Sequence, residues 1–244
     1  MAVMAKAPRA GHVKTRLQSV VSAEEAASLG AAFLLDTTSN LHAAAAEAPI
    51  HPFVAYAPAG HEDRFDGHLA PGTQLILADG TLGDAPGVEG LGCSLLHATR
   101  ALLALGYGAA CLVNADGPTL PTAFLVHACR RLLAPGRRAV IGPAEDGGYW
   151  LIGVQQPEAG LYAGIGWSTE HVAAETISRA AEIGLALEEA GTWYDVDDQE
   201  SLTRLIQEMG QPHAPGETPF PAPATARTIA AIGLAARLRA LERC

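Results

Sequence analysis

Lysine is scarce in this 244-residue sequence: of its 16 basic residues, only Lys6 and Lys14 are lysines. Long apolar runs are also missing, and none approaches the roughly 20 residues that a membrane-spanning helix needs. The N-terminus lacks the basic region and apolar stretch that mark a signal peptide. Acidic residues outnumber basic ones by 26 to 16, and the net charge of −10 argues against binding to nucleic acid or to an anionic membrane. These absences predict a cytoplasmic protein with no membrane span and no nucleic-acid partner.

The four cysteines, Cys93, Cys111, Cys129 and Cys244, show no C-x-x-C spacing, and three of them lie in apolar surroundings. They are typical of buried, reduced thiols and not of a metal or disulfide framework. Hydrophobic residues make up 49% of the chain and charged residues 17%, which predicts a folded protein with a substantial core. The length fits one large domain, or one domain with an appendage.

Apolar, strand-like segments alternate with helical patterns, which is typical of an α/β fold with a mainly parallel central sheet flanked by helices. Strands are expected at Ala2–Ala5, His51–Ala57, Thr73–Ala78, Ala109–Val113, Ala139–Gly142, Tyr149–Val154 and Leu185–Val196. Helices are expected at 23–46, 94–105, 121–133, 169–182, 199–209 and 225–243. A single domain is therefore predicted over residues 1–210, followed over 211–244 by a proline-rich linker and a C-terminal helix. That helix would either pack on the core or mediate a homodimer.

Capping residues mark the start of three of these helices. Ser22 and Glu25, three residues apart, form the pattern of a capping box. Ser168 or Thr169 is expected to cap the helix that ends near residue 182. Asp198 is expected to cap the helix at 199–209, which would leave the neighbouring acidic residues free for another role.

A basic loop follows the first strand. Its cationic side chains lie on both sides of Gly11, which permits a tight backbone path: Lys6, Arg9, Lys14 and Arg16. A strand, a glycine-containing basic turn and a helix form the arrangement that cradles phosphates. The loop is not a Walker A motif, because two residues separate Gly11 from Lys14. The alternative is that the two lysines lie together by chance.

Acidic residues follow three of the expected strands: Asp116, Asp146, and Asp195 with Asp197. Ligands of open α/β sheets bind beyond the carboxyl ends of the strands, where these side chains are expected. Alternation along an extended segment places Asp195 and Asp197 on the same side. Carboxylate oxygens without His or Cys partners favour Mg²⁺ or Mn²⁺. The alternative is that these aspartates only brace turns or cap helices.

Four motifs occur in order in the chain: Lys6-x-Pro8-x-x-Gly11-x-x-Lys14-Thr15-Arg16-Leu17, then Ala115-Asp116-Gly117-Pro118-x-Leu120, then Gly142-Pro143-x-x-Asp146-Gly147-Gly148-Tyr149-x-Leu151-Ile152-Gly153, then Trp167-Ser168-Thr169 with Asp195-Val196-Asp197. The set resembles a bacterial glycosyltransferase-like family, known as a domain of unknown function or as radical-SAM- and selenodomain-associated transferases. Some members are assigned to arsenosugar biosynthesis. The chain is similar, more distantly, to the guanylyltransferases that act on phospholactate and on the molybdenum cofactor.

The resemblance covers about residues 2–210 and implies a GT-A-like nucleotide-diphospho-sugar transferase fold. It implies nucleotide binding by Lys6, Pro8, Arg9, Gly11, Lys14 and Arg16. It implies a metal site formed by Asp116, Asp195 and Asp197. It implies an acceptor site bordered by Gly147, Gly148, Tyr149, Trp167, Ser168 and Thr169. The chain departs from the family pattern at two places, which are Gly117 after the metal-site aspartate and the shortened, acidic stretch Glu89–Gly92.

The expected reaction is transfer of a sugar from a nucleotide sugar to a small acceptor, with Mg²⁺ or Mn²⁺ as cofactor. The metal, Lys14 and Arg16 would stabilise the leaving diphosphate. Asp116 and Lys14 would thus be catalytic, and Asp146 would orient or deprotonate the acceptor hydroxyl. A nucleotidyltransferase that releases pyrophosphate is the closest alternative, and a non-catalytic nucleotide-binding protein is a further one. No cluster of basic residues lies between Gly142 and Arg179 to receive a phosphorylated acceptor, which favours glycosyl transfer.

Overall fold

The computed structural model describes residues 1–209, 211 and 218–241. Residues 212–217 of the expected proline-rich linker, and the last residues of the expected C-terminal helix, therefore lie outside the described residues. Within the described part of the chain, no helix is both long and apolar enough to cross a membrane.

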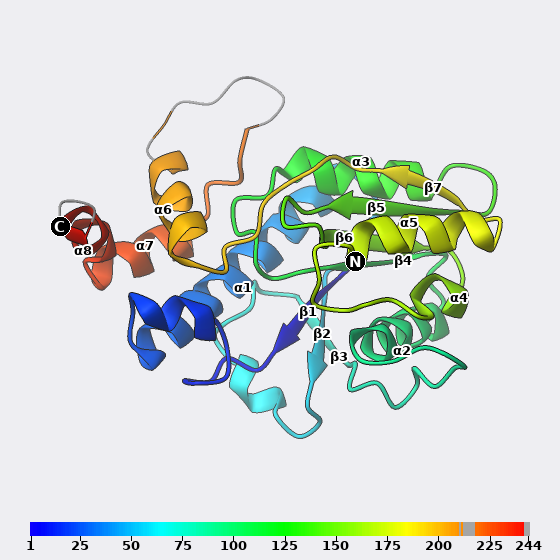
Figure 1. Cartoon of the computed structure of the whole chain (residues 1–244), viewed down its shortest axis with the longest axis horizontal. Coiled ribbons are helices and arrows are strands. Elements are labelled where there is room, and N and C mark those ends of the chain that lie inside the picture. The colour runs from blue at the N-terminus through cyan, green and yellow to red at the C-terminus, as the bar shows by residue number, and fades with distance from the viewer. Residues whose placement is uncertain (210, 212–217, 242–244) are drawn as a thin grey trace.

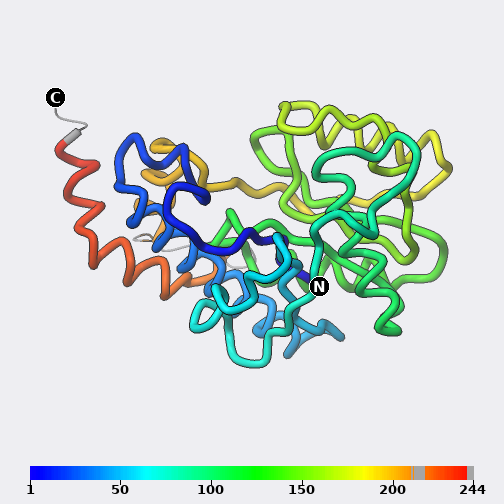
Figure 2. Tube along the Cα trace, turned by 90° about the horizontal axis from the view of Figure 1, so that it is seen from below, coloured from blue at the N-terminus to red at the C-terminus, as the bar shows by residue number. Residues whose placement is uncertain are grey.

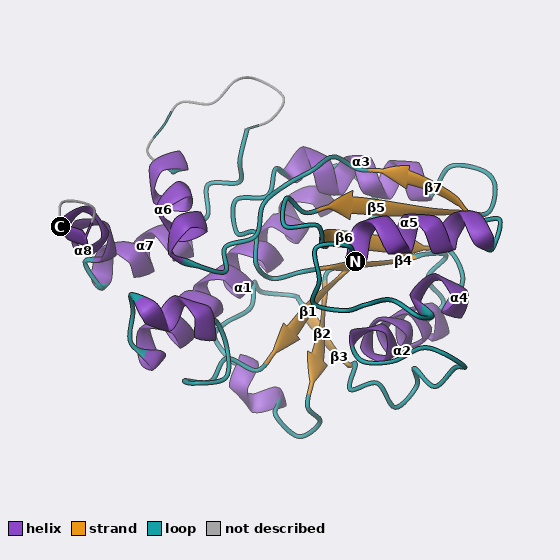
Figure 3. Cartoon of the chain, in the orientation of Figure 1, coloured by secondary structure: helices purple, strands orange, loops and turns teal. Residues whose placement is uncertain are grey.

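One sheet organises the described chain, with its seven strands in the order β3-β2-β1-β4-β6-β5-β7 (Figure 3). The strands are β1 (Ala2–Lys6), β2 (Phe53–Ala57), β3 (Gln74–Leu77), β4 (Ala110–Val113), β5 (Arg138–Pro143), β6 (Tyr149–Val154) and β7 (Ala186–Glu189). All neighbouring pairs are parallel except those of β6, which is antiparallel to both β4 and β5. The mainly parallel sheet is thus confirmed.

Helices cover both faces of the sheet (Figure 1). They are α1 (Ala23–Ala45), α2 (Leu91–Ala104), α3 (Thr122–Leu132), α4 (Ala159–Tyr162), α5 (Val172–Glu182), α6 (Gln199–Glu208), α7 (Pro223–Ala231) and α8 (Leu234–Leu241), with two short 3₁₀ helices, η1 (Thr15–Ser19) and η2 (Glu62–Phe65). Alternate strand residues point to opposite faces. Val3 accordingly packs with α1 and α3 in one buried cluster, and Ala2 packs with α2, α4 and α5 in another.

A third buried cluster joins the C-terminal helices to the basic loop. Leu17 of η1 and Phe33 of α1 pack with Leu205 of α6 and with Leu234 and Leu238 of α8. Figure 2 shows α8 beside the loop that follows β1. The C-terminal helices therefore pack on the core of the same chain.

Asp36 anchors these helices, since its fully buried carboxylate accepts hydrogen bonds from the backbone N–H groups of Ala224 at 3.0 Å and Thr225 at 2.7 Å. These donors belong to the first turn of α7, which carries no side-chain cap of its own at Ala222. A carboxylate from α1 thus satisfies N–H groups that a helix start leaves unpaired.

Two capping predictions are confirmed. Ser22 and Glu25 form the reciprocal hydrogen bonds of a capping box at the start of α1. Asp198 caps α6 by accepting from the N–H of Ser201. The cap expected at Ser168 or Thr169 is wrong: α5 starts at Val172, because the backbone at Ser168 is left-handed, with φ 65°.

Two element boundaries also differ from the prediction. The strand expected to reach Val196 ends at Glu189, because the chain turns at Gly191, whose φ is 101°. The single last helix is two helices, α7 and α8, separated at Gly233, whose φ of 64° a continuing α-helix cannot accommodate. The four-residue α4 was not predicted.

Candidate functional site

The site lies between β1 and β4, where the strand order reverses direction. From β1 the sheet continues through β2 to β3 on one side, and through β4 to the remaining strands on the other. Ligands of open α/β sheets bind at such a point, beyond the carboxyl ends of the strands. A pocket of about 340 Å³ occupies this position. Its lining includes Lys6, Pro8, Lys14, Arg16, Asp116 and Asp197.

The basic loop forms one wall of this pocket. Gly11 has the positive φ, 77°, that the sequence predicts for a tight turn. The loop lies close to α1, where a side chain added at Gly30 would meet Val13 at 3.4 Å. Arg9 and Gly11 belong to the same loop but are not among the residues that line the pocket.

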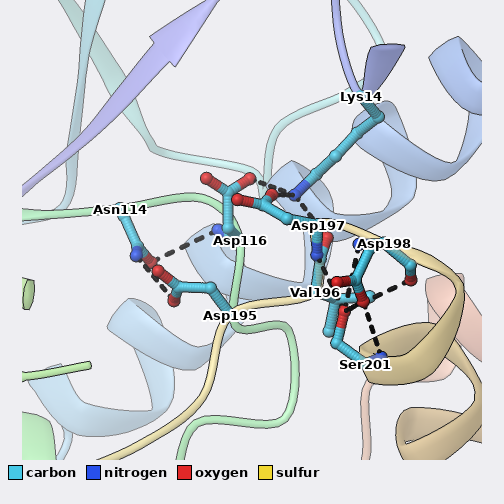
Figure 4. Close-up of polar contacts among 8 residues, drawn as sticks. All are labelled: Lys14, Asn114, Asp116, Asp195, Val196, Asp197, Asp198 and Ser201. Atoms are coloured by element: carbon cyan, nitrogen blue, oxygen red, sulfur yellow. Dashed lines mark hydrogen bonds and ion pairs between the residues drawn. The ribbon is translucent and has the colours of Figure 1, made fainter. Parts of the chain in front are cut away.

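Lys14 contacts three other residues of the site through its side-chain nitrogen (Figure 4). Its Nζ donates to the backbone carbonyl of Val196 at 2.7 Å and to Oδ1 of Asp197 at 3.0 Å, and forms an ion pair with Asp116. Its side chain is only 7% exposed, whereas those of Asp116 and Asp197 are 38% and 39% exposed. Burial alone would lower the pKa of Lys14, but the two carboxylates outweigh it and raise that pKa overall.

Asp195 lies beside this group but faces a different partner. Asn114 donates from Nδ2 to Oδ1 of Asp195 at 2.8 Å, and its own Oδ1 accepts from the N–H of Asp116 at 3.3 Å. Burial, and after it the charge of Asp116, raise the pKa of Asp195 to about 7, although the bond from Asn114 acts in the opposite direction. The three predicted metal-site aspartates are therefore neighbours, with Asp197 turned to Lys14 and Asp195 turned to Asn114 (Figure 4).

The donor set fits a hard divalent cation. Oxygens of Asp116 and Asp197 converge on one point, the Lys14 nitrogen. A third carboxylate, the half-buried Asp195, is close enough to Asp116 for the charge of Asp116 to raise its pKa. Among the residues that the structure describes, no group of three or more His, Cys, Asp or Glu side chains is arranged to hold a metal ion, so a cation here would need further ligands. Mg²⁺ commonly binds through one or two carboxylates together with substrate phosphates, a demand that Asp116 and Asp197 could meet.

The turn between β5 and β6 is tightly built. Oδ1 of Asp146 accepts from the N–H of Gly148 at 2.9 Å, and the carbonyl of Gly147 accepts from the N–H of Ala173 at 2.9 Å. A side chain at Gly147 would lie 1.9 Å from the carbonyl oxygen of Glu170. Asp146 is exposed, and its charge contributes to the raised pKa of Asp195. The charge of Asp146 therefore acts on Asp195, although Asp146 is not among the residues that line the pocket.

None of the six predicted acceptor residues, those of the turn included, is among the residues that line the pocket. Trp167 packs on the start of α2, where a side chain at Gly92 would meet its ring at 3.1 Å. Thr169 donates to the carbonyl of Gly166 at 2.7 Å. The hydroxyl of Tyr149 and the ring N–H of Trp167 are buried and lack a hydrogen-bond partner among the described residues.

Three groups of the site were not assigned a role from the sequence: Asn114, the carbonyl of Val196, and Phe33, whose ring lies 5.2 Å from the Lys14 nitrogen. Asn114 stands two residues before Asp116 at the end of a strand. That position could have indicated from the sequence that Asn114 belongs to the site. A backbone carbonyl and an aromatic face carry no such signal.

Comparison with known proteins assigns the chain to a family. Residues 40–169 match a family described as an uncharacterized protein conserved in bacteria, DUF2064. No curated protein sequence matches the chain. The crystal structure of a candidate nucleotide-diphospho-sugar transferase from Desulfovibrio desulfuricans G20 is similar, with a TM-score of 0.76 and 26% identity, over 98% of this chain and 95% of that chain.

Two mycobacterial structures are more distant. A homolog of Rv0371c from Mycobacterium sp. strain JC1 has a TM-score of 0.44 and 17% identity, over 84% of this chain and 94% of its own. Rv0371c of Mycobacterium tuberculosis H37Rv has a TM-score of 0.43 and 15% identity, over 85% of this chain and 99% of its own. The expected nucleotide-diphospho-sugar transferase fold is confirmed by the Desulfovibrio structure. Because the matched segment exceeds half of the sequence, the chain belongs to the DUF2064 family.

Proposed function

We propose that this protein is a metal-dependent glycosyltransferase that moves a sugar from a nucleotide sugar to a small acceptor. The observation that carries the proposal is one pocket lined by the basic loop and by the carboxylates of Asp116 and Asp197. Cationic side chains suit the diphosphate of a donor, and paired carboxylates suit a divalent cation shared with phosphates. The similarity to the Desulfovibrio protein supports the same class of donor.

The roles of the residues follow from their positions. Asp116 and Asp197 would hold Mg²⁺ or Mn²⁺, with Asp195 beside them. The bound cation would supply a Lewis acid that stabilises negative charge on the leaving diphosphate. Lys6 and Arg16 line the same pocket and would add positive charge to the donor phosphates. Pro8 and Lys14 line it as well. Arg9 and Gly11, in the same loop, would complete the nucleotide-binding site.

The acceptor would enter beside the turn between β5 and β6. The bond from Gly148 holds one oxygen of Asp146, and the second oxygen would orient an acceptor hydroxyl or accept its proton. The neighbouring residues Gly147, Tyr149, Trp167, Ser168 and Thr169 would form the border of the acceptor site. A phosphorylated acceptor would need free basic side chains here. No Lys or Arg lies between Gly142 and Arg179 in the sequence, and Arg204, which reaches the turn, is paired with Glu145. This favours glycosyl over nucleotidyl transfer.

A turnover assay tests the proposal. Nucleotide sugars and nucleoside triphosphates are incubated with small acceptors and Mn²⁺, and release of nucleoside diphosphate or of pyrophosphate is measured. Asp116→Asn and Asp197→Asn should each slow diphosphate release by about 100-fold or more, the order of loss seen when one transition-state charge partner is removed. The matched control Asp66→Asn, at an exposed aspartate, should keep its activity. Pyrophosphate release would indicate nucleotidyl transfer, and unchanged turnover in both site variants would refute the metal assignment.

A further inference from the structure

The position where the site's carboxylate oxygens converge holds the ammonium group of Lys14. Its nitrogen contacts Asp116, Asp197 and the carbonyl of Val196 at the same time. These partners lie on two segments far from the loop in sequence, one after β4 and one before α6. The ammonium group therefore balances two carboxylates with one positive charge.

The backbone of the loop directs Lys14 to this position. Lys14 precedes η1 with φ 50° and ψ 39°, a left-handed conformation that few non-glycine residues adopt. Strain of this kind persists only where the surrounding structure enforces it, and it is common at functional sites. Here Leu17 of η1 is fully buried, and Phe33 lies under the ammonium group. The contact is thus built into the fold of the loop.

Lys6 provides the contrast within the same pocket. It lines the pocket as Lys14 does, but it is exposed. Both lysines are available for donor phosphates by position, yet only Lys14 is in contact with Asp116 and Asp197 in this structure. The two lysines therefore differ in their partners: Lys14 pairs with carboxylates, and Lys6 is exposed in the pocket.

We propose that Lys14 occupies the divalent-cation position and must withdraw from the carboxylates before Mg²⁺ or Mn²⁺ can bind there. An ammonium group and a divalent cation cannot both contact the same oxygens, because their positive charges repel at that distance. Lys14 also lines the pocket, so its charge becomes available to donor phosphates when it withdraws. The cation and the donor should then each favour binding of the other. This inference rests on the proposed function.

The chain allows a direct test, because Lys6 and Lys14 are its only lysines. The protein is treated briefly with an amine-acetylating reagent, with and without Mn²⁺, and acetylation of each lysine is measured by mass spectrometry. Lys6 is the internal reference. Lys14 should react far less than Lys6 without Mn²⁺, and addition of Mn²⁺ should raise the ratio of Lys14 to Lys6 several-fold. Equal reactivity without Mn²⁺, or a ratio that saturating Mn²⁺ leaves unchanged, would overturn the inference.

A binding measurement provides the second test. Lys14→Met keeps a long side chain without the charge, and Lys6→Met is the matched control. Lys14→Met should bind Mn²⁺ about tenfold more tightly than the unmodified chain, within the usual range of coupling between two ligands of one protein. Lys6→Met should bind Mn²⁺ unchanged. No gain in a folded Lys14→Met variant refutes the exchange. If that variant does not fold, the labelling test decides, because it needs no variant.

The two proposals can fail separately. If Mn²⁺ exposes Lys14 but no sugar is transferred from any nucleotide sugar, the exchange stands and the proposed function fails. If sugar transfer depends on Mn²⁺ while Lys14 stays protected, the function stands and the exchange fails.

Discussion

Replacing Asp36 with alanine should lower the free energy of unfolding by about 3 kcal/mol. The carboxylate is 1% exposed and accepts two hydrogen bonds, from the N–H groups of Ala224 and Thr225. A hydrogen bond to a charged group contributes about 1.5–3 kcal/mol, so the two together contribute about 3–6 kcal/mol. Burial raises the pKa of Asp36 and so opposes its charge, which places the expected loss near the lower end of this range.

The assay is urea denaturation at pH 7, followed by tryptophan fluorescence. Asp36→Ala should shift the midpoint and leave the slope with urea unchanged, since the same surface is exposed on unfolding. Asp36→Asn keeps one acceptor oxygen and should lose about half as much. A loss below about 1 kcal/mol in Asp36→Ala would show that the start of α7 does not depend on this carboxylate, and the assigned role of Asp36 would be wrong.

Three further predictions concern the site. Asn114→Ala should weaken Mn²⁺ binding at pH 7 by about tenfold, as loss of a group that orients a metal ligand does; equal binding in titration calorimetry would contradict this. The folded chain retains a proton on Asp195 up to about pH 7, whereas the unfolded chain releases it near pH 4, so the free energy of unfolding without metal should fall as pH rises between these values. The same urea titrations on Asp195→Asn should lack this pH dependence. An equal pH dependence in that variant would contradict its assignment to Asp195. Gly147→Ala should cost about 1–2 kcal/mol from its left-handed backbone alone, with a clash against Glu170 added, and a neutral result in thermal unfolding would contradict the turn geometry.

Features that are local in sequence were predictable. The buried run before Asp116 predicts β4, because a strand covered on both faces is continuously apolar. The capping box at Ser22 and the cap at Asp198 each depend on a hydrogen bond that spans three residues. The position of the basic loop beside Asp116 follows from the rule that ligands bind beyond the carboxyl ends of parallel strands.

Features that depend on distant contacts were not predictable. The bond from Asn114 to Asp195 spans 81 residues, and that from Lys14 to Asp197 spans 183. A side chain's partner at such a separation depends on how the whole sheet is assembled. The sequence therefore predicts that Lys14 lies at the site with donor phosphates as its partners, but its contacts with Asp116 and Asp197 depend on segments far away in the chain. The anchoring of α7 by Asp36 is of the same kind, with 188 residues between Asp36 and Ala224.

Metal-dependent binding of a nucleotide donor is tested most simply by thermal unfolding. The chain is unfolded with nucleoside diphosphates and with nucleotide sugars, each with and without Mn²⁺. A ligand at about 100 times its dissociation constant should add roughly 2.7 kcal/mol of stability. A nucleoside diphosphate and its sugar conjugate should both stabilise the chain, Mn²⁺ should increase the effect, and Asp116→Asn should remove the increase. If no nucleotide stabilises the chain, with or without Mn²⁺, the proposal that the pocket binds a nucleotide donor is wrong.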